Sequence, residues 1–360
     1  MPCSPAITPF VDLLCSLIGI PSISREEGPA TDFLEGWMKN YGLSPRRIGN
    51  NLLLCDEPLD VPSSKPTLLL NAHIDTVRPA KAYTRDPFTP TIVDEPRGNV
   101  LYGLGSNDDG GSLVALLQTY LILRERPQPY RLIYAATAEE EVCGVGGMDM
   151  VIPYLGEVDL GIIGEPTGMQ MAVGERGLMV LDCVAHGKSG HAARSEGVNA
   201  IYEALRDIEW FRTYEFPLKS EVLGPVKMTV TIISAGTAHN VVPAECTFTV
   251  DVRPNGMYTN VELLSLIRER VGCDVTPRST RLGSSNIPST HPVVVRGKSL
   301  GMTCFGSPTT SNQAVCPFTT LKIGPGDSAR SHTADEFIIL GEIEDGVNKY
   351  VALLDGLELR

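Results

Sequence analysis

The sequence predicts an α/β protein: a main domain built on a mixed sheet with helices on both faces, and an inserted α+β domain. Up to residue 172, short apolar runs alternate with segments of helical periodicity. Between residues 173 and 284, strands and helices follow one another in an order typical of a small α+β unit. The chain of 360 residues is about twice the usual length of one domain. We therefore expect a discontinuous main domain, residues 1–172 and 285–360, and an inserted domain, residues 173–284.

The elements of the main domain follow from the spacing of its apolar residues. The segments with helical spacing are residues 6–19, 28–41, 112–125 and 342–354. The short apolar runs, which fit strands buried on both faces, are residues 67–70, 131–137, 160–164 and 318–323. In the inserted domain the expected order is strand, helix, two strands and helix, at residues 177–186, 198–211, 226–234, 246–253 and 261–271.

Composition limits the classes of function. The net charge of -13 argues against a nucleic-acid-binding protein, which needs clustered Lys and Arg. It also fits an ordinary acidic protein that gains solubility from its charge. The apolar stretch Phe10–Ile20 is interrupted by Asp12 and is too short and polar to cross a membrane. None of the nine cysteines lies in a CxxC motif, and the count is odd, so we expect reduced thiols in a cytoplasmic protein.

Side chains able to do chemistry follow the ends of three predicted strands. His73-Ile74-Asp75, Glu139-Glu140-Glu141 and Glu165 each come just after an apolar run. Because ligands of open α/β sheets bind at the carboxyl ends of the strands, we expect a site at this edge.

His73 and Asp75 stand two apart, so on an extended segment they share a side. Asp75 can then accept a hydrogen bond from one ring nitrogen of His73 and leave the other for a metal ion. An isolated His-x-Asp motif more often has a structural role than a functional one. Asp108 lies in a Gly-rich turn that opens a helix, where it fits either a helix cap or a carboxylate bridging two metal ions.

The three successive glutamates are harder to explain as a solvated acidic loop, because they repel one another unless a cation is present. One of them can hold a metal ion while its neighbour takes a proton from the attacking water. With Glu165, and with His332 in a Gly- and Pro-rich loop, the chain offers nitrogen and oxygen ligands suited to two Zn²⁺ ions, or to Co²⁺ or Mn²⁺.

In this order the motifs resemble the M20 (ArgE/DapE) metallopeptidase family over essentially the whole chain. The matching segments include His73–Val77, Gly103–Asp108, Thr137–Glu141, Gly164–Thr167, Gly187–His191, Asn240–Pro243, Asp251–Arg253, and Gly324–Gly326 followed by His332. The resemblance implies that Asp108 bridges two metal ions, that His73 and Glu165 complete one site, and that Glu141 and His332 complete the other. It also implies that Asp75 orients His73 and that Glu140 is the general base. The family glycine that stands five residues after the ligand glutamate is Gly146, which favours Glu141 over Glu140 as the ligand.

For the inserted domain the resemblance implies a lid or dimerisation domain and a homodimer. His191 would stabilise the oxyanion in the partner subunit's active site, although without the resemblance a surface histidine is the simpler interpretation. Asn240 and Arg253 would bind a small-molecule substrate. One departure concerns Gly110, which stands where the family usually has a lysine two residues after the bridging aspartate.

The motifs and the compact length look most like acetylornithine deacetylases. This implies metal-dependent hydrolysis of an N2-acyl-L-ornithine, acetyl- or succinyl-ornithine, in arginine biosynthesis. Arg176 and Arg194 are either surface charges or cations for a second substrate carboxylate. The alternatives are another M20 amidohydrolase, namely a succinyl-diaminopimelate desuccinylase, an acyl-lysine deacetylase or a dipeptidase, and a non-catalytic metal-binding homologue.

Overall fold

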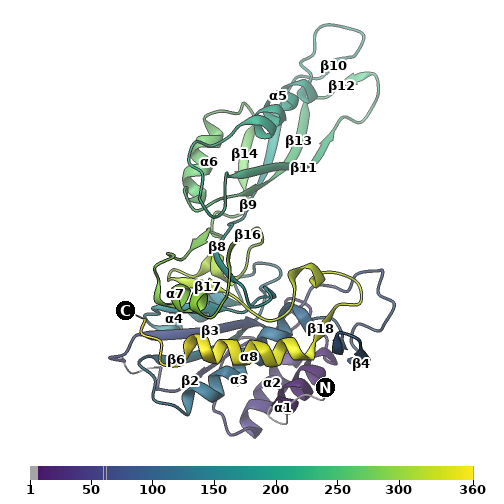
Figure 1. Cartoon of the computed structure of the whole chain (residues 1–360). Coiled ribbons are helices and arrows are strands. Elements are labelled where there is room, and N and C mark those ends of the chain that lie inside the picture. Colours follow the sequence, from purple (N-terminus) through teal and green to yellow (C-terminus); the bar gives the residue numbers. More distant parts are fainter. Residues whose placement is uncertain (1–6, 60, 62, 360) are drawn as a thin grey trace. The chain divides into compact units, whose positions relative to one another are not determined.

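The computed structural model of the chain describes residues 7–59, 61 and 63–359, so Cys3 lies outside the described residues. The chain forms two compact units (Figure 1). Unit 1 comprises Met1–Val173, Asn286–Phe305 and Ser311–Arg360, and unit 2 comprises Gly174–Ser285 and Gly306–Thr310. Residues 306–310 therefore belong to unit 2, although the sequence placed them in the main domain.

Unit 1 is built on a mixed sheet with the strand order β1-β2-β6-β3-β7-β17-β8-β15, with β16 beside β8. Its strands are β1 (Arg46–Ile48), β2 (Asn51–Cys55), β3 (Thr67–His73), β6 (Arg131–Thr137), β7 (Leu160–Ile163), β8 (Met171–Glu175), β15 (Ser285–Asn286), β16 (Cys304–Ser307) and β17 (Thr320–Lys322). The central strands β6, β3, β7 and β17 run parallel to one another, whereas β2 and β8 pair antiparallel with them. The predicted fold class is confirmed.

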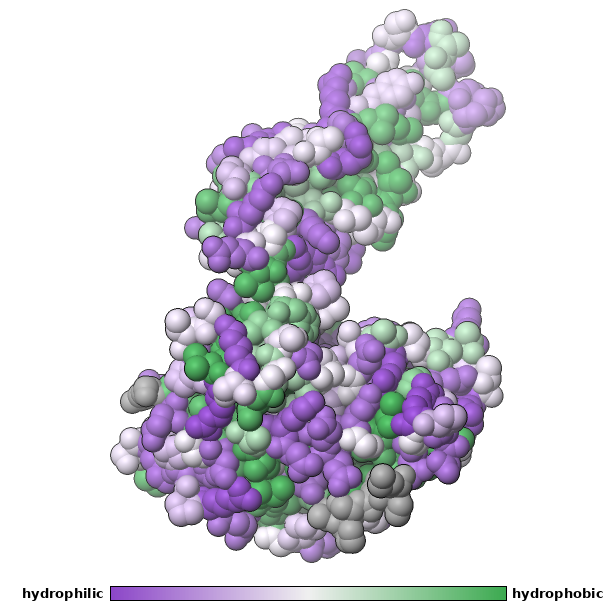
Figure 2. All heavy atoms as spheres, viewed as in Figure 1, coloured by the Kyte–Doolittle hydropathy of each residue, from purple (hydrophilic) through white to green (hydrophobic). Residues whose placement is uncertain are grey.

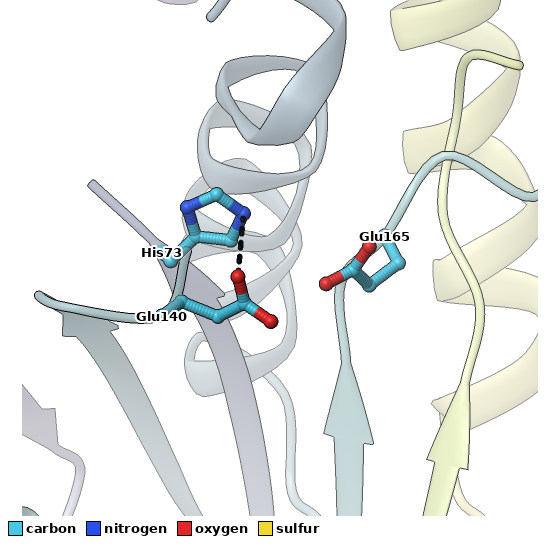
Figure 3. Close-up of side chains that lie close together, drawn as sticks. All are labelled: His73, Glu140 and Glu165. Atoms are coloured by element: carbon cyan, nitrogen blue, oxygen red, sulfur yellow. Dashed lines mark ion pairs between the residues drawn. The ribbon is translucent and has the colours of Figure 1, made fainter. Parts of the chain in front are cut away.

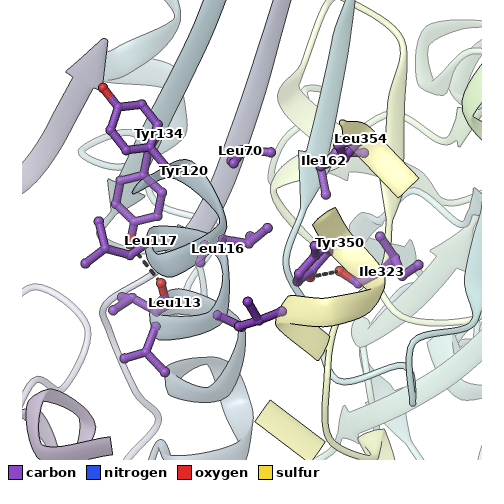
Figure 4. Packing of buried hydrophobic residues seen from close by; sticks show 14 of the residues in the cluster. Leu70, Leu113, Leu116, Leu117, Tyr120, Tyr134, Ile162, Ile323, Tyr350 and Leu354 are labelled. Carbon is purple, nitrogen blue, oxygen red and sulfur yellow. Dashed lines mark hydrogen bonds between the residues drawn. The ribbon is translucent and has the colours of Figure 1, made fainter. Parts of the chain in front are cut away.

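Helices cover both faces of this sheet because its central strands are apolar on both sides. The helices of unit 1 are α1 (Thr8–Ile18), α2 (Gly28–Asn40), α3 (Gly111–Arg124), α4 (Met148–Leu155), α7 (Pro292–Ser299) and α8 (Leu340–Leu354). On β3, Leu68 and Leu70 pack into the cluster formed with α1, α2, α3 and α8, part of which is drawn in Figure 4. Leu69 points the other way, into the cluster formed with α4. This alternation is the two-residue period of a strand.

A small antiparallel sheet, β18-β5-β4, lies beside α8 and the segment Ser106–Gly110. Its strands are β4 (Thr91–Glu95), β5 (Gly98–Tyr102) and β18 (Phe337–Ile339). The sequence analysis did not predict this sheet. It matters for the site because β18 begins directly after Glu336.

Unit 2 contains an antiparallel sheet with the order β11-β13-β9-β14 and the helices α5 (Ala200–Thr213) and α6 (Asn260–Arg268). Its strands are β9 (Met179–His186), β11 (Lys227–Ala235), β13 (Glu245–Arg253) and β14 (Asp274–Pro277). Burial alternates along β13, and both helices contribute to a single core cluster, so one face of the sheet is covered. A two-stranded ribbon pairs β10 (Gly190–His191) with β12 (Val241–Val242).

Among the described residues, no helix has the length and apolar character needed to cross a membrane. The eight cysteines within the described ranges are all free thiols.

Candidate metal centre

The ends of three parallel strands bring the predicted acidic residues to one edge of the sheet in unit 1. β3 ends at His73, β6 is followed by the glutamates 139–141, and β7 is followed by Glu165. The strands β6, β3 and β7 are neighbours, so these side chains meet. Figure 3 shows His73, Glu140 and Glu165 gathered at these strand ends.

Two groups of side chains in this cluster are close enough to share a metal ion. One atom each from His73, Glu140 and Glu165 lie within 4.8 Å of one another, and so do atoms of His73, Asp108 and Glu141. His332 joins the second group: its Nε2 lies 2.9 Å from Glu141 Oε2 and 3.7 Å from Asp108 Oδ2. The structure thus brings the five predicted ligands and Glu140 into one cluster.

The ring of His73 is held in one orientation. Its Nδ1 lies 2.9 Å from the main-chain oxygen of Asp75, so Nδ1 carries the proton and donates it there. The other ring nitrogen, Nε2, faces Asp108 Oδ1 at 3.2 Å and Glu140 Oε2 at 3.9 Å. Nε2 is therefore the ring nitrogen that is free to bind a metal ion.

The Asp75 side chain has partners beyond His73 that the sequence did not predict. The main-chain oxygen of Asp75, not its carboxylate, is the hydrogen-bond acceptor for His73; the carboxylate Oδ1 is 3.5 Å from Nδ1. The carboxylate instead accepts the main-chain N–H groups of Glu140 and Glu141, at 3.0 and 3.1 Å, and the hydroxyl of Ser24 at 2.7 Å. Asp75 therefore supports the glutamates as much as the histidine.

Asp108 is held by Glu336, a residue that the sequence analysis missed. The buried carboxylate of Glu336 accepts the main-chain N–H groups of Gly105, Asn107 and Asp108, at 3.0, 2.9 and 2.9 Å. Burial, followed by the charge of Asp108, raises the pKa of Glu336 to about 7. In the sequence, only its position four residues after His332 could have indicated that Glu336 belongs to the site.

The three glutamates point in different directions. Gly146 donates its N–H to the Glu139 carboxylate at 3.3 Å, and a Cβ at Gly144 or Gly146 would overlap that carboxylate. Glu139 is thereby turned away from the cluster, while Glu140 faces His73 and Glu141 faces His332. This arrangement leaves Glu140 and Glu141 in the cluster and Glu139 outside it.

The cluster holds more buried negative charge than its own cations neutralise. Burial raises the pKa of Glu140 well above its ordinary range, with smaller contributions from Glu141, Asp75 and Asp108. Burial and neighbouring carboxylates also raise the pKa of Glu165, although Lys322 opposes this effect. Burial raises the pKa of Glu141, against a hydrogen bond from His332.

Asp109, the residue after Asp108, is another buried carboxyl group beside this cluster. Burial raises its pKa to about 7, and its Oδ1 is buried without a hydrogen-bond partner. Such crowding of carboxylates is costly unless cations are bound. Two imidazoles and three carboxylates are also ligands that Zn²⁺ accepts, so the residues fit a pair of divalent ions.

The predicted residues of unit 2 form two separate groups. Pairing of His191 with Val241 in the β10–β12 ribbon places His191 beside Asn240, whose main-chain oxygen accepts the N–H of Ala192 at 3.0 Å. The Nδ1 of His191 accepts the N–H of Ala193 at 3.1 Å, so in the neutral ring Nε2 carries the proton. Arg194 is exposed, and its main-chain N–H donates to the main-chain oxygen of His191 at 2.8 Å.

The other group surrounds the two remaining arginines. Arg253 forms a bidentate pair with Asp251, at 2.7 and 3.0 Å, and also reaches Thr310 Oγ1 at 3.1 Å. Arg176 is buried, and its guanidinium donates to the main-chain oxygens of Leu223, Pro225 and Arg253. These bonds occupy the guanidinium, so the structure favours a structural role for Arg176 over the substrate contact that the sequence analysis considered.

Known protein families match both parts of the chain. The Peptidase dimerisation domain family matches residues 173–273, and Peptidase family M28 matches residues 59–156. An acetylornithine deacetylase of Proteus mirabilis is 30% identical over 93% of each chain. A succinyl-diaminopimelate desuccinylase of Cereibacter sphaeroides is 28% identical over 76% of this chain and 75% of its own.

A solved structure shares the fold over the whole length. A Bacillus subtilis dinuclear metal-binding peptidase from the M20 family superposes with a TM-score of 0.72 at 15% identity, covering 99% of this chain and 100% of that one. The same family is indicated by the two-part fold, by the acidic residues clustered at the strand ends and by the full-length relatives. The chain belongs to the M20 (ArgE/DapE) family of metallopeptidases and is a hydrolase of that family.

Proposed function

We propose that the chain is a zinc-dependent amidohydrolase that converts an N2-acyl-L-ornithine, acetyl- or succinyl-ornithine, to ornithine and a carboxylate in arginine biosynthesis. The observation that carries the hydrolytic part is the meeting of Glu140 with two histidines and three carboxylates at one sheet edge. The choice of ornithine rests on the acetylornithine deacetylase that is 30% identical to this chain.

The metal ligands in this proposal are the five clustered residues. Asp108 would be shared by two Zn²⁺ ions, His73 and Glu165 would complete one site, and Glu141 and His332 would complete the other. When bound, the ions supply Lewis-acid polarisation of the scissile carbonyl and make the attacking water more acidic. Co²⁺ and Mn²⁺ accept the same ligand types.

Glu140 carries the proton through the reaction. It takes a proton from the water as the water oxygen bonds to the amide carbon, and delivers it to the amine nitrogen as the C–N bond breaks. The position of Glu140 suits this transfer, because its carboxylate faces the cluster, 3.9 Å from His73 Nε2. His191, with the proton on Nε2, would donate to the oxyanion, and Asn240 and Arg253 would bind the substrate.

A panel of substrates tests this proposal. With the purified, zinc-loaded protein we expect kcat/KM for acetyl- or succinyl-ornithine to exceed that for succinyl-diaminopimelate, acetyl-lysine and a dipeptide by at least about tenfold, as measured by mass-resolved product analysis. The panel also distinguishes acetyl- from succinyl-ornithine. Arg194 is the remaining candidate cation for the second carboxylate of a succinyl group. A preference for succinyl-diaminopimelate would instead support a second candidate function, that of a succinyl-diaminopimelate desuccinylase, which the relative of that name favours. Hydrolysis of none of these amides would contradict the substrate assignment.

We also propose that unit 2 mediates a homodimer, as the matched dimerisation domain suggests. β11 is an edge strand of its sheet, and within the described residues β13 is its one neighbour. Ile232 and Ile233 on β11 are 59% and 53% exposed, and hydrophobic side chains gather on the surface over β11 and β13 (Figure 2). An exposed apolar edge strand is a favourable surface for pairing with a second copy.

A charge on this edge is therefore expected to break the dimer. Ile233→Lys should convert the dimer to a monomer in size-exclusion chromatography with light scattering, because pairing would bury the new charge. Val295→Lys, at a residue equally exposed on α7 of unit 1, is the matched control and should stay dimeric. A wild-type monomer with full activity would contradict both the dimer and the action of His191 on a partner subunit.

A further inference from the structure

The turn that carries Glu140 and Glu141 is fixed through its backbone. Four consecutive N–H groups, those of residues 138–141, donate to side-chain oxygens from other parts of the chain. The bonds are Ala138 N to Asn51 Oδ1 at 2.9 Å, Glu139 N to Glu27 Oε1 at 3.2 Å, and Glu140 N and Glu141 N to Asp75 at 3.0 and 3.1 Å. We call residues 138–141 the glutamate turn.

Glu27 is the most distant of these supports in the sequence, 112 residues from Glu139. It is fully buried, with 0% of the residue exposed, just before α2. Its Oε1 also accepts the N–H of Arg25 at 2.6 Å, and its Oε2 accepts Nδ2 of Asn50 at 3.1 Å. Within the described residues, its side-chain hydrogen bonds go to these groups and to Glu139, not to any of the five proposed ligands.

The backbone at Glu139 depends on such support. Glu139 has a φ of 54°, in the left-handed region that residues other than glycine rarely adopt. A conformation of this kind persists only where its surroundings hold it. Without Glu27, the N–H of Glu139 would lose its charged acceptor, which favours relaxation of the turn and movement of the next side chain, Glu140.

We propose that Glu27 is a positioning residue, which fixes the glutamate turn through the N–H of Glu139 and so holds Glu140 against the substrate. It acts through backbone geometry and touches no reacting atom. The inference rests on the proposed function, because it takes Glu140 as the base.

Two substitutions of Glu27 test the inference. Glu27→Ala should lower kcat by about 10- to 100-fold with little change in KM, because small displacements of a catalytic group are costly. Amide hydrogen exchange, followed by mass spectrometry, should become faster in peptides that cover the glutamate turn. Glu27→Gln should keep most of the wild-type kcat and of the protection from exchange. Its amide oxygen can accept the N–H groups of Arg25 and Glu139 once the Asn50 amide has flipped.

Asp207→Ala is the matched control. The buried carboxylate of Asp207 also accepts two main-chain N–H groups, those of Gly272 and Cys273, at 2.9 and 2.8 Å, but in unit 2. Its loss should lower stability while leaving kcat and exchange in the glutamate turn unchanged. A purely structural role for Glu27 would give the same pattern as this control.

The outcomes separate the inference from the proposed function. If Glu27→Ala keeps the kcat and the exchange protection of the wild type, the positioning role is wrong. Should that variant fail to fold, Glu27→Asp, whose shorter side chain falls short of Glu139, must show the loss of kcat and protection; wild-type values there would overturn the role as well. Glu140→Ala is measured in parallel: full activity in that variant overturns the proposed function, whereas an inactive Glu140→Ala beside a fully active Glu27→Ala overturns the positioning role alone.

Discussion

Glu140→Gln is expected to lower kcat by about a thousandfold while leaving KM and the bound metal content nearly unchanged. The amide has the shape of the carboxylate but cannot accept the proton of the attacking water. Glu140 lies in the buried cluster, 3.9 Å from His73 Nε2, without being one of the five proposed ligands. Steady-state kinetics and elemental analysis of the same preparation measure both quantities.

The neighbouring residue provides the control. Glu139→Gln changes the same functional group one residue away, but the Glu139 side chain points to Gly146 rather than into the cluster. This variant should keep kcat within about threefold of the wild type. If the two variants lose activity equally, or if Glu140→Gln remains fully active, the assignment of the base is wrong.

Removal of divalent ions is expected to abolish hydrolysis and to lower the Tm by an amount that grows with pH. Without ions, four buried carboxylates keep raised pKa values: about 7 for Asp109 and for Glu336, and well above the ordinary range for Glu140 and Glu165. Between the ordinary and the raised value the folded chain binds more protons than the unfolded chain. The free energy of unfolding therefore falls as pH rises through this range.

His332 contributes in the same direction. Its hydrogen bond to Glu141 raises its pKa from 6.5 to about 9, so the stability from this pair is present below 6.5 and is lost as pH rises through about 9. Bound ions favour the deprotonated ligands and remove this dependence. The difference in Tm between loaded and chelated protein should be larger at about pH 8.5 than at about pH 5.5, by roughly 5 °C or more.

Glu140→Gln also serves as a control for this pH dependence. It removes one buried carboxylate, so the chelated variant should be more stable than the chelated wild type at high pH. Differential scanning calorimetry across the pH range measures these effects. Equal Tm differences at low and high pH would contradict the electrostatic account of the cluster.

Much of the fold was predictable because the central strands are continuously apolar. β6 was predicted with the bounds that it has, Arg131–Thr137, and α3 within one residue at each end. The small sheet β18-β5-β4 was missed. Its β4 is half exposed and β18 has only three residues, so neither gives a clear pattern of burial.

The candidate site was predictable where chemistry follows a strand end directly, as for His73, Glu140 and Glu165. The residues that hold these side chains in place were not. Glu27 and Glu336 support main-chain groups that lie more than 100 residues away, and such contacts leave no local pattern. The same holds for the bonds from Glu140 N and Glu141 N to the Asp75 carboxylate, which join groups 65 and 66 residues apart in the sequence.

We expect the five side chains to hold two divalent ions at the carboxyl edge of the sheet. An anomalous-difference map of a zinc-loaded crystal tests it directly. We expect one peak at about 2.0–2.2 Å from ligand atoms of His73, Asp108 and Glu165, and a second at similar distances from Asp108, Glu141 and His332. Anomalous peaks only at other positions would contradict the account. So would the absence of a peak at this edge in a protein that still hydrolyses its substrate.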